Sequence, residues 1–234
     1  MPSTTRLIAL ATTYGAEKYF TNVYEDLVKI SDRCSDEDAA KFELTPDDIV
    51  MFGGGEDIPP SYYNEVANRQ AMYPVVPSKR DKLEKLFFKK AVEAGARMIG
   101  ICRGAQMITA LSGGKLWQHV ENHNSMHTME YNLDLLPNHL RILIPSYTTS
   151  VHHQMCRVET IPMKVDLLAW SAISPVYYDE KDKKHLPEYK EPEIFYVPNL
   201  KALCFQGHPE FDTLDGDYAI FSKSLANYYF GAKR

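Results

Sequence analysis

The stretch RMIGICRGAQMITAL, residues 97–111, predicts a buried strand that turns abruptly into a helix. Residues 97–101 are largely apolar, which is typical of a short strand in the interior of a sheet. Residues 103–111 continue with helical spacing of their apolar positions, and the pair Gly113-Gly114 ends the helix. A strand and a helix in such close succession indicate an α/β fold, in which helices cover a parallel sheet.

Cys102 occupies the turn between this strand and this helix, with Gly100 and Gly104 two positions to either side. The G-x-nucleophile-x-G pattern is that of a nucleophile elbow, where small residues are needed because the turn crowds the backbone. Such a turn holds the thiol above the sheet at a helix N-terminus, and the helix dipole there favours the thiolate. The alternative, a buried cysteine between two incidental glycines, stays open on these five residues alone.

Strands and helices alternate along the flanking chain. The best-defined helix covers residues 78–94, with Ser78 as N-cap, Asp81 completing a capping box and Gly95 ending it. Further elements follow from apolar spacing: helices at 19–30 and 218–229, strands at 6–12, 49–52, 116–120, 140–144, 167–170, 193–197 and 202–206, and a solvated loop at 179–192. We expect one domain over residues 1–234, built on a mostly parallel sheet with helices on both faces.

Composition narrows the class of protein. The 234 residues are 44% hydrophobic and 24% charged, which is ordinary for a globular protein and excludes a disordered chain, a collagen-like fibre and a coiled coil. The net charge of −5 argues against nucleic-acid binding. Membrane-spanning and signal-peptide segments are not expected. The four cysteines form no CxxC pair, so a reduced, cytoplasmic protein is predicted.

A base for the thiol is found in His208-Pro209-Glu210, which follows the strand expected at 202–206. Proline favours an extended conformation at His208, and side chains two apart on an extended chain point the same way. Glu210 could therefore hold one ring nitrogen of His208 and leave the other for Cys102. Taken alone, such a tripeptide is more often a surface loop than part of a catalytic site. Together with the elbow cysteine, it favours a catalytic His-Glu pair.

Gly53-Gly54-Gly55 follows the strand expected at 49–52 and could supply backbone N–H groups to an oxyanion. A flexible loop or a phosphate-binding turn is the alternative. Neither a Walker A pattern nor a GxGxxG occurs, so no nucleotide cofactor is predicted. His119, His123 and His127 are four residues apart, but the asparagines and serine between them favour a loop over a helical metal face, and no metal is predicted.

Five blocks together resemble the class I glutamine amidotransferase-like family, and within it the γ-glutamyl-γ-aminobutyrate hydrolase-like branch of the peptidase C26 group. The blocks are Gly53 to Pro59 (similar to GGxDxxP), Arg80-Asp81 with Glu84 (RD..E), Gly100 to His119 (GICRGxQxxNxxxGGxLxQH), His152-His153-Gln154 (SxHHQ) and Gln206 to Glu210 (QWHPE). Gly207 stands where the family usually has Trp, and Thr109 where it usually has Asn. These departures leave the triad residues in place and leave the identity of the substrate open.

The resemblance implies a three-layer flavodoxin-like fold and a Cys102–His208–Glu210 triad that hydrolyses glutamine or another γ-glutamyl amide. It implies an oxyanion hole of backbone N–H groups, and substrate contacts from a second set of side chains. The oxyanion residues are Gly54, Gly55 and Arg103, and the substrate-binding residues are Gln106, His152, His153 and Gln154. Glutamine-dependent release of ammonia would require an ATP-dependent synthetase or ligase as a partner chain. The alternatives are a stand-alone γ-glutamyl hydrolase and a catalytically silent binding or regulatory relative.

Overall fold

The computed structural model describes residues 4–11, 15–69, 76–174, 176–181, 183–185 and 190–231. Its centre is an eight-stranded sheet in the order β2-β1-β3-β4-β15-β14-β11-β8. These strands are β1 (Arg6–Leu10), β2 (Asp26–Ile30), β3 (Ile49–Phe52), β4 (Arg97–Ile101), β8 (Glu130–Tyr131), β11 (Asp166–Ser171), β14 (Glu191–Val197) and β15 (Ala202–Phe205). The five strands from β2 to β15 are parallel, and β14, β11 and β8 extend the sheet antiparallel. The α/β prediction is therefore confirmed.

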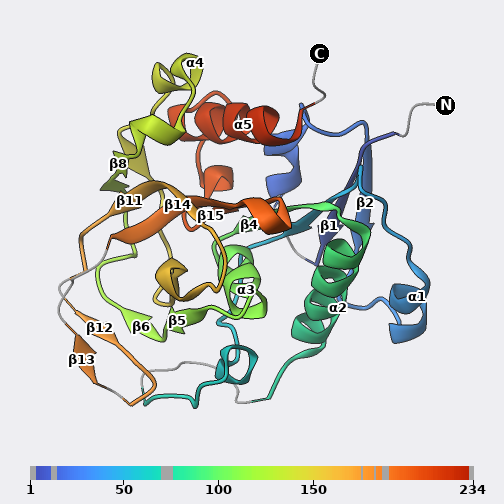
Figure 1. Cartoon of the computed structure of the whole chain (residues 1–234), viewed down its shortest axis with the longest axis horizontal. Coiled ribbons are helices and arrows are strands. Elements are labelled where there is room, and N and C mark those ends of the chain that lie inside the picture. The colour runs from blue at the N-terminus through green and yellow to red at the C-terminus, as the bar shows by residue number, and fades with distance from the viewer. Residues whose placement is uncertain are drawn as a thin grey trace.

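Successive residues of each strand point to opposite faces of the sheet, and helices cover both faces, so the side chains on each face are buried. On β3, Val50 and Phe52 join the core beneath α2 (Lys79–Ala94) and α3 (Arg103–Leu111), whereas Ile49 and Met51 join the core beneath α5 (Asp217–Phe230). Figure 1 shows α5 and α4 (Asn138–Arg141) on one side of the sheet and α2 and α3 on the other. This is the predicted three-layer arrangement.

The helix around residues 78–94 forms as predicted. The Ser78 hydroxyl accepts a hydrogen bond from the Asp81 N–H, and the Asp81 carboxylate accepts one from the Ser78 N–H. Both hydrogen bonds of the capping box are therefore formed. Gly95 follows α2 with φ 65°, the left-handed conformation that favours glycine. A short helix, α1 (Asp36–Lys41), lies in the polar segment before β3.

The helix predicted at 19–30 is wrong. Residues 16–20 form a 3₁₀ turn, η1 (Ala16–Phe20), and after a turn at residues 21–25 the edge strand β2 begins at Asp26. The spacing of Val23, Leu27 and Ile30 fits a helix, but Leu27 and Ile30 pair with β1 in a parallel ladder. Pairing with a neighbouring strand decides such ambiguous apolar segments, and it is not visible in local spacing.

The strand predicted at 140–144 is also wrong, since α4 covers its first residues, with Leu140 buried and Ile142 exposed. The strand predicted at 116–120 is divided into β5 (Lys115–Trp117) and β6 (His119–Val120) at the buried Gln118. The loop predicted at 179–192 contains β13 (Lys184–His185) and the buried start of β14 at Glu191. Residues 182 and 186–189 of that loop lie outside the described residues.

In the described part of the chain, three small antiparallel sheets form beside the large one. They pair β5 with β10 (Met155–Arg157), β6 with β12 (Tyr177–Tyr178) and β13, and β7 (His127–Thr128) with β9 (Tyr147–Thr148). None of the helices within the described ranges is long and apolar enough to cross a membrane.

Candidate active site

Three of the predicted blocks meet because they follow three neighbouring parallel strands. Gly53 follows β3, Cys102 follows β4, and the segment to His208 follows β15. The carboxyl ends of parallel strands lie at the same edge of the sheet, which is where ligands bind in open α/β folds. Residues about 50 to 100 positions apart in the chain are thereby brought to one place.

Cys102 has the backbone of a strained elbow, with φ 48° and ψ −107°. Its N–H donates to the Phe205 carbonyl of β15 at 2.7 Å, which ties the turn to the neighbouring strand. A side chain at Gly100 would place its Cβ 2.8 Å from the Ala105 nitrogen, and one at Gly104 would overlap the Phe52 carbonyl. The two glycines are thus required by close backbone approach, as the elbow pattern predicts.

His208 lies between Cys102 and Glu210. Its Nδ1 is 2.9 Å from Glu210 Oε1, and His208 lines the same cavity as Cys102. Burial lowers the pKa of His208, but the charge and hydrogen bond of Cys102 and those of Glu210 outweigh it and raise the pKa to about 10. His208 is therefore held in its protonated form at neutral pH.

The local backbone around Glu210 differs from the one expected. His208 is extended, but Glu210 lies in a 3₁₀ turn, η6 (Pro209–Phe211), so the contact between their side chains arises from a turn rather than from a continuous extended segment. Thr149 fixes the turn: its hydroxyl donates to the His208 carbonyl at 2.6 Å, and it also accepts from the His208 N–H at 3.1 Å. Gly207 has no room for a side chain, since a Cβ there would overlap Thr148.

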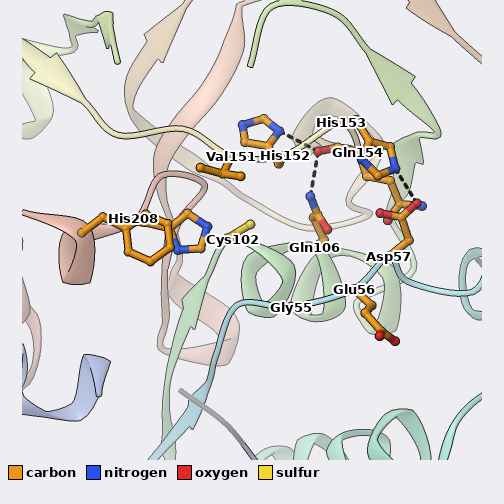
Figure 2. Close-up of a pocket in the computed structure, with 11 residues that line it drawn as sticks. Gly55, Glu56, Asp57, Cys102, Gln106, Val151, His152, His153, Gln154 and His208 are labelled. Atoms are coloured by element: carbon orange, nitrogen blue, oxygen red, sulfur yellow. Dashed lines mark hydrogen bonds and ion pairs between the residues drawn. The ribbon is translucent and has the colours of Figure 1, made fainter. Parts of the chain in front are cut away.

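A cavity of about 260 Å³ opens beside these residues (Figure 2). Seven of the predicted site residues line it, namely Gly55, Cys102, Gln106, His152, His153, Gln154 and His208. Gly54, Arg103 and Glu210 are not among the lining residues. Glu56, Asp57, Val151 and Phe211 also line the cavity and were not predicted as site residues. The GGGEDIP block contains Glu56 and Asp57, so that block offered a signal for them, whereas Val151 and Phe211 carry no motif of their own.

The predicted substrate-binding residues form a hydrogen-bonded wall. Gln106 Nε2 donates to the Gln154 carbonyl at 2.7 Å, and His152 Nδ1 donates to the same oxygen at 2.8 Å (Figure 2). The side chain of Gln154 accepts from the Ile58 N–H at 2.9 Å and so holds the loop that follows the glycines. His153 Nε2 contacts Asp57 Oδ2 at 2.7 Å. Gln154 and His153 are thus engaged with this loop.

His152 keeps one free nitrogen. Within the described residues its buried Nε2 has no hydrogen-bond partner, while the donating Nδ1 makes the ring a neutral tautomer with an acceptor at Nε2. Burial, reinforced by the neighbouring His123, holds the pKa of His152 well below its usual value. His152 therefore offers the cavity a hydrogen-bond acceptor.

A second buried polar network, absent from the sequence predictions, lies behind His152. His127 Nε2 contacts Glu193 Oε1 at 2.7 Å, and His123 Nε2 lies 2.9 Å from the Ser174 hydroxyl and 3.5 Å from Glu191. One ligand-type atom each from His123, His127 and Glu193 fall within 4.8 Å of one another. His119 does not join them, and its ring packs against His153 and Tyr178.

Hydrogen bonds shift the pKa values of Glu191 and His127 in this network. Burial raises the pKa of Glu191, but bonds from His123, Ser174 and the Ile173 N–H hold it well below its usual value. Burial lowers the pKa of His127, and its bond to Glu193 raises it more strongly. Buried carboxylates and imidazoles that are paired in this way stabilise the loops behind the cavity.

An elbow cysteine at the carboxyl edge of a mostly parallel sheet, with a histidine from the adjacent strand, is the arrangement of the class I glutamine amidotransferase-like proteins. The chain belongs to the peptidase C26 family, whose model matches residues 28–171, more than half of its length.

Two relatives in sequence are named glutamine amidotransferase-like proteins. The glutamine amidotransferase-like protein YvdE of Lactococcus lactis is 30% identical over 126 residues, which are 49% of this chain and 52% of that protein. A glutamine amidotransferase-like protein of Rickettsia prowazekii is 35% identical over 77 residues, 33% of this chain and 27% of that protein. The matches thus span about half or less of these relatives.

Solved structures share the fold over nearly the whole chain. A protein of Thermoplasma acidophilum, described as one of the subunits of a GMP synthase, aligns with a TM-score of 0.59 and 13% identity, covering 97% of this chain and 94% of that one. A glutamine amidotransferase of Thermotoga maritima aligns with a TM-score of 0.55 and 16% identity, covering 97% of this chain and 83% of that one. At this level of identity the likeness shows the fold alone.

Proposed function

We propose that this chain hydrolyses a γ-glutamyl amide, with Cys102 as nucleophile, His208 as acid and base, and Glu210 as the group that orients His208. The observation that carries the proposal is that Cys102 and His208 line the same cavity, with Glu210 Oε1 2.9 Å from Nδ1 of His208. A cysteine, a base and an orienting carboxylate in that order are what covalent catalysis requires.

The reaction divides into two half-reactions. The Cys102 thiolate attacks the γ-carbonyl carbon, and the negative charge moves to the carbonyl oxygen. When the C–N bond breaks, protonated His208 gives its proton to the leaving nitrogen, and a γ-glutamyl thioester remains on Cys102. Neutral His208 then removes a proton from water, the oxygen attacks the thioester carbon, and the C–S bond breaks. Glutamate leaves, and both the thiolate and the imidazolium are restored.

Backbone N–H groups of Gly54 or Gly55 and of Arg103 are proposed to stabilise the oxyanion. Within the described part of the chain, neither the Gly55 nor the Arg103 N–H donates to another protein group, so both are free for a substrate oxygen. Gln106 and the His152–Gln154 segment are proposed to hold the glutamyl end.

In the favoured version the amide is glutamine, and the ammonia passes to an ATP-dependent synthetase or ligase on a separate chain. The family membership supports glutamine chemistry. The fold neighbour from Thermoplasma acidophilum is described as a GMP synthase subunit, and by analogy we propose a partner chain here as well. We further propose that residues 1–234 act as one domain in the cytoplasm, with no cofactor and no metal.

One observation favours the alternative, a hydrolase that acts without a partner on a γ-glutamyl conjugate of a larger amine. Val151 and Phe211 line the cavity beside His208 yet are 56% and 51% exposed. A substituent on the leaving nitrogen would lie along this apolar wall, and ammonia has none to place there. Exposed apolar side chains at a binding cavity are a common sign of a contact surface.

The test is turnover of glutamine and of γ-glutamyl-p-nitroanilide by the purified chain and its Cys102→Ala variant. Removing the nucleophile of a triad lowers the rate by several orders of magnitude, about 10⁶-fold in measured examples. The fold is checked by the far-ultraviolet circular dichroism and the melting temperature. Retained turnover in a folded Cys102→Ala protein would remove the proposed mechanism, and turnover of the anilide without turnover of glutamine would favour the alternative.

A further inference from the structure

Arg80 joins α2 to the glycine loop that follows β3. Its Nη2 donates to two consecutive carbonyls, Gly53 O at 3.1 Å and Gly54 O at 2.8 Å. Its Nε donates to Glu84 Oε1 at 2.8 Å, one turn further along the helix. The side chain is mostly buried, and that of Glu84 is fully buried, so this contact is shielded from water.

The two carbonyls that Arg80 holds belong to the peptide units that carry the Gly54 and Gly55 N–H groups. A trans peptide is planar, and its N–H points opposite to its C=O. When Arg80 binds the Gly54 carbonyl, the Gly55 N–H is turned away from Arg80, and Gly55 lines the cavity that contains Cys102. Holding these oxygens therefore fixes the direction of the N–H groups proposed to bind the oxyanion.

Glu84 connects both halves of the proposed oxyanion hole. One carboxylate oxygen accepts from Arg80, and the other accepts from the buried guanidinium of Arg103, the residue directly after Cys102. Arg103 also pairs with Asp81. The Gly55 N–H belongs to the loop after β3 and the Arg103 N–H to the first residue of α3, and the carboxylate of Glu84 contacts the arginine associated with each of them.

Gly55 has a conformation that suits this contact. Its φ of 147° is one that residues with a side chain rarely adopt, and a Cβ there would overlap Nη1 of Arg80. The loop and the guanidinium therefore fit one another closely. Lysine could not replace the contact, because one ammonium lacks the planar fork that reaches a carboxylate and two carbonyls together.

We propose that Arg80 is a positioning residue that preorients the backbone oxyanion donors of Gly54 and Gly55 and, through Glu84, ties them to Arg103. The inference rests on the proposed hydrolysis of a γ-glutamyl amide. It predicts an effect on the chemical step alone, because the donors act on the charge that develops in the transition state and not on the ground-state amide.

The test compares Arg80→Met with the wild type, using glutamine and γ-glutamyl-p-nitroanilide as substrates and iodoacetamide as a probe of Cys102. Methionine keeps an apolar stem of similar length, and the buried Glu84 carboxylate still has Arg103 as a cationic partner. We expect kcat to fall about 10²-fold, the loss typical of a misplaced oxyanion donor, with KM within about twofold. Alkylation of Cys102 should stay within about twofold, since displacement of iodide forms no oxyanion.

Two further variants sharpen the comparison. Arg80→Lys keeps the charge but can hold fewer oxygens, so its kcat should lie between those of Arg80→Met and the wild type. Lys89→Met is the matched control: it removes a cation from the same helix, where Lys89 is 73% exposed and its Nζ lies 3.6 Å from Glu93 Oε1. Its kcat and KM should equal those of the wild type.

The outcomes separate this inference from the proposed function. If the wild type turns over neither substrate, the proposed function is wrong, and the role of Arg80 falls with it. If the wild type is active and Arg80→Met keeps its kcat within about threefold, far below the loss of an oxyanion donor, only the inference about Arg80 is wrong. A fall in kcat that is matched by an equal fall in Cys102 alkylation would also overturn it, because the effect would then be on the thiolate or on folding.

Discussion

The imidazole of His208 lies flat against the ring of Phe211, with the ring centroids 4.3 Å apart and the planes 4° apart. Phe211 ends the same 3₁₀ turn that carries Glu210, so a single turn supplies both a hydrogen bond to the edge of the imidazole and an apolar cover for its face. The ring of His208 is thereby fixed in rotation, with its second nitrogen toward Cys102 (Figure 2).

Glu210→Gln should be much milder than His208→Ala. Glutamine can still occupy the position of the carboxylate, and the Phe211 stack continues to orient the ring, whereas without His208 no group transfers protons in either half-reaction. We expect His208→Ala to lower kcat at least about tenfold more than Glu210→Gln does. Steady-state kinetics of both variants give the ratio. Equal losses would show that Glu210 has a role besides orientation.

Cys102 should react with a γ-chloroketone analogue of glutamine before any other cysteine. It lies at the N-terminus of α3 and lines the same cavity as His208, and a helix N-terminus and a nearby imidazolium both make a thiol more reactive. Burial raises the pKa of Cys156 to about 12 and that of Cys204 well above its usual value, so these two are inert thiols. Cys34 is partly exposed and is the internal control.

The measurement for this prediction is peptide mapping after limited labelling at about pH 6.5, well below the usual thiol pKa of about 8.5. His208→Ala should lose much of the labelling at Cys102, because only the helix dipole remains. Labelling of Cys34 ahead of Cys102 would contradict the nucleophile assignment.

The protonation state of His208 should depend on Cys102. With a pKa of about 10, His208 keeps its proton through neutral pH and loses it only as the pH rises through that value. Cys102→Ala removes the first of the groups whose interactions raise the pKa of His208, so His208 should titrate at lower pH in that variant. Nuclear magnetic resonance of the imidazole carbons between about pH 5 and 11, a range that spans the ordinary histidine pKa, follows the titration directly. An unchanged midpoint would exclude the ion pair with Cys102.

Gly104→Ala should destabilise the fold strongly. Its Cβ would overlap the Phe52 carbonyl of β3, a backbone group that cannot move without disturbing the sheet. We expect a loss of about 3 kcal/mol in the free energy of unfolding, at the upper end of the usual cost of overpacking. Urea denaturation measures it.

Gly95→Ala is the matched control, because Gly95 has φ 65°, and among the described residues beyond its chain neighbours an added methyl group would meet just the flexible Lys201 amine, at 3.8 Å. Its cost should be about 1 kcal/mol, the conformational penalty alone. Similar losses in both variants would show that close approach of the backbone is not the reason for glycine at position 104.

Strands and helices could be predicted where the apolar spacing of the sequence agreed with the burial of those residues in the structure. β3, β4 and α3 have the predicted bounds, since each is a continuous apolar or periodic segment bounded by glycine or by a sharp turn. The edge of the sheet was predicted poorly. β2 has helical apolar spacing and becomes a strand only because β1 offers it a ladder.

By itself, the sequence determined which chemical groups the site contains and where each turn must be sharp. The elbow glycines, the cysteine and the His-Pro-Glu block are local features whose steric and electrostatic requirements are met within a few residues. The tertiary structure decided which distant groups touch: Phe211 on His208, Arg80 on the glycine carbonyls, and Glu84 between two arginines. Such contacts depend on the order of strands in the sheet and on the packing of α2 against the loop after β3. Neither the strand order nor this packing produces a periodic pattern in the sequence. Pairing between distant segments is determined by the whole core and not by neighbours in sequence.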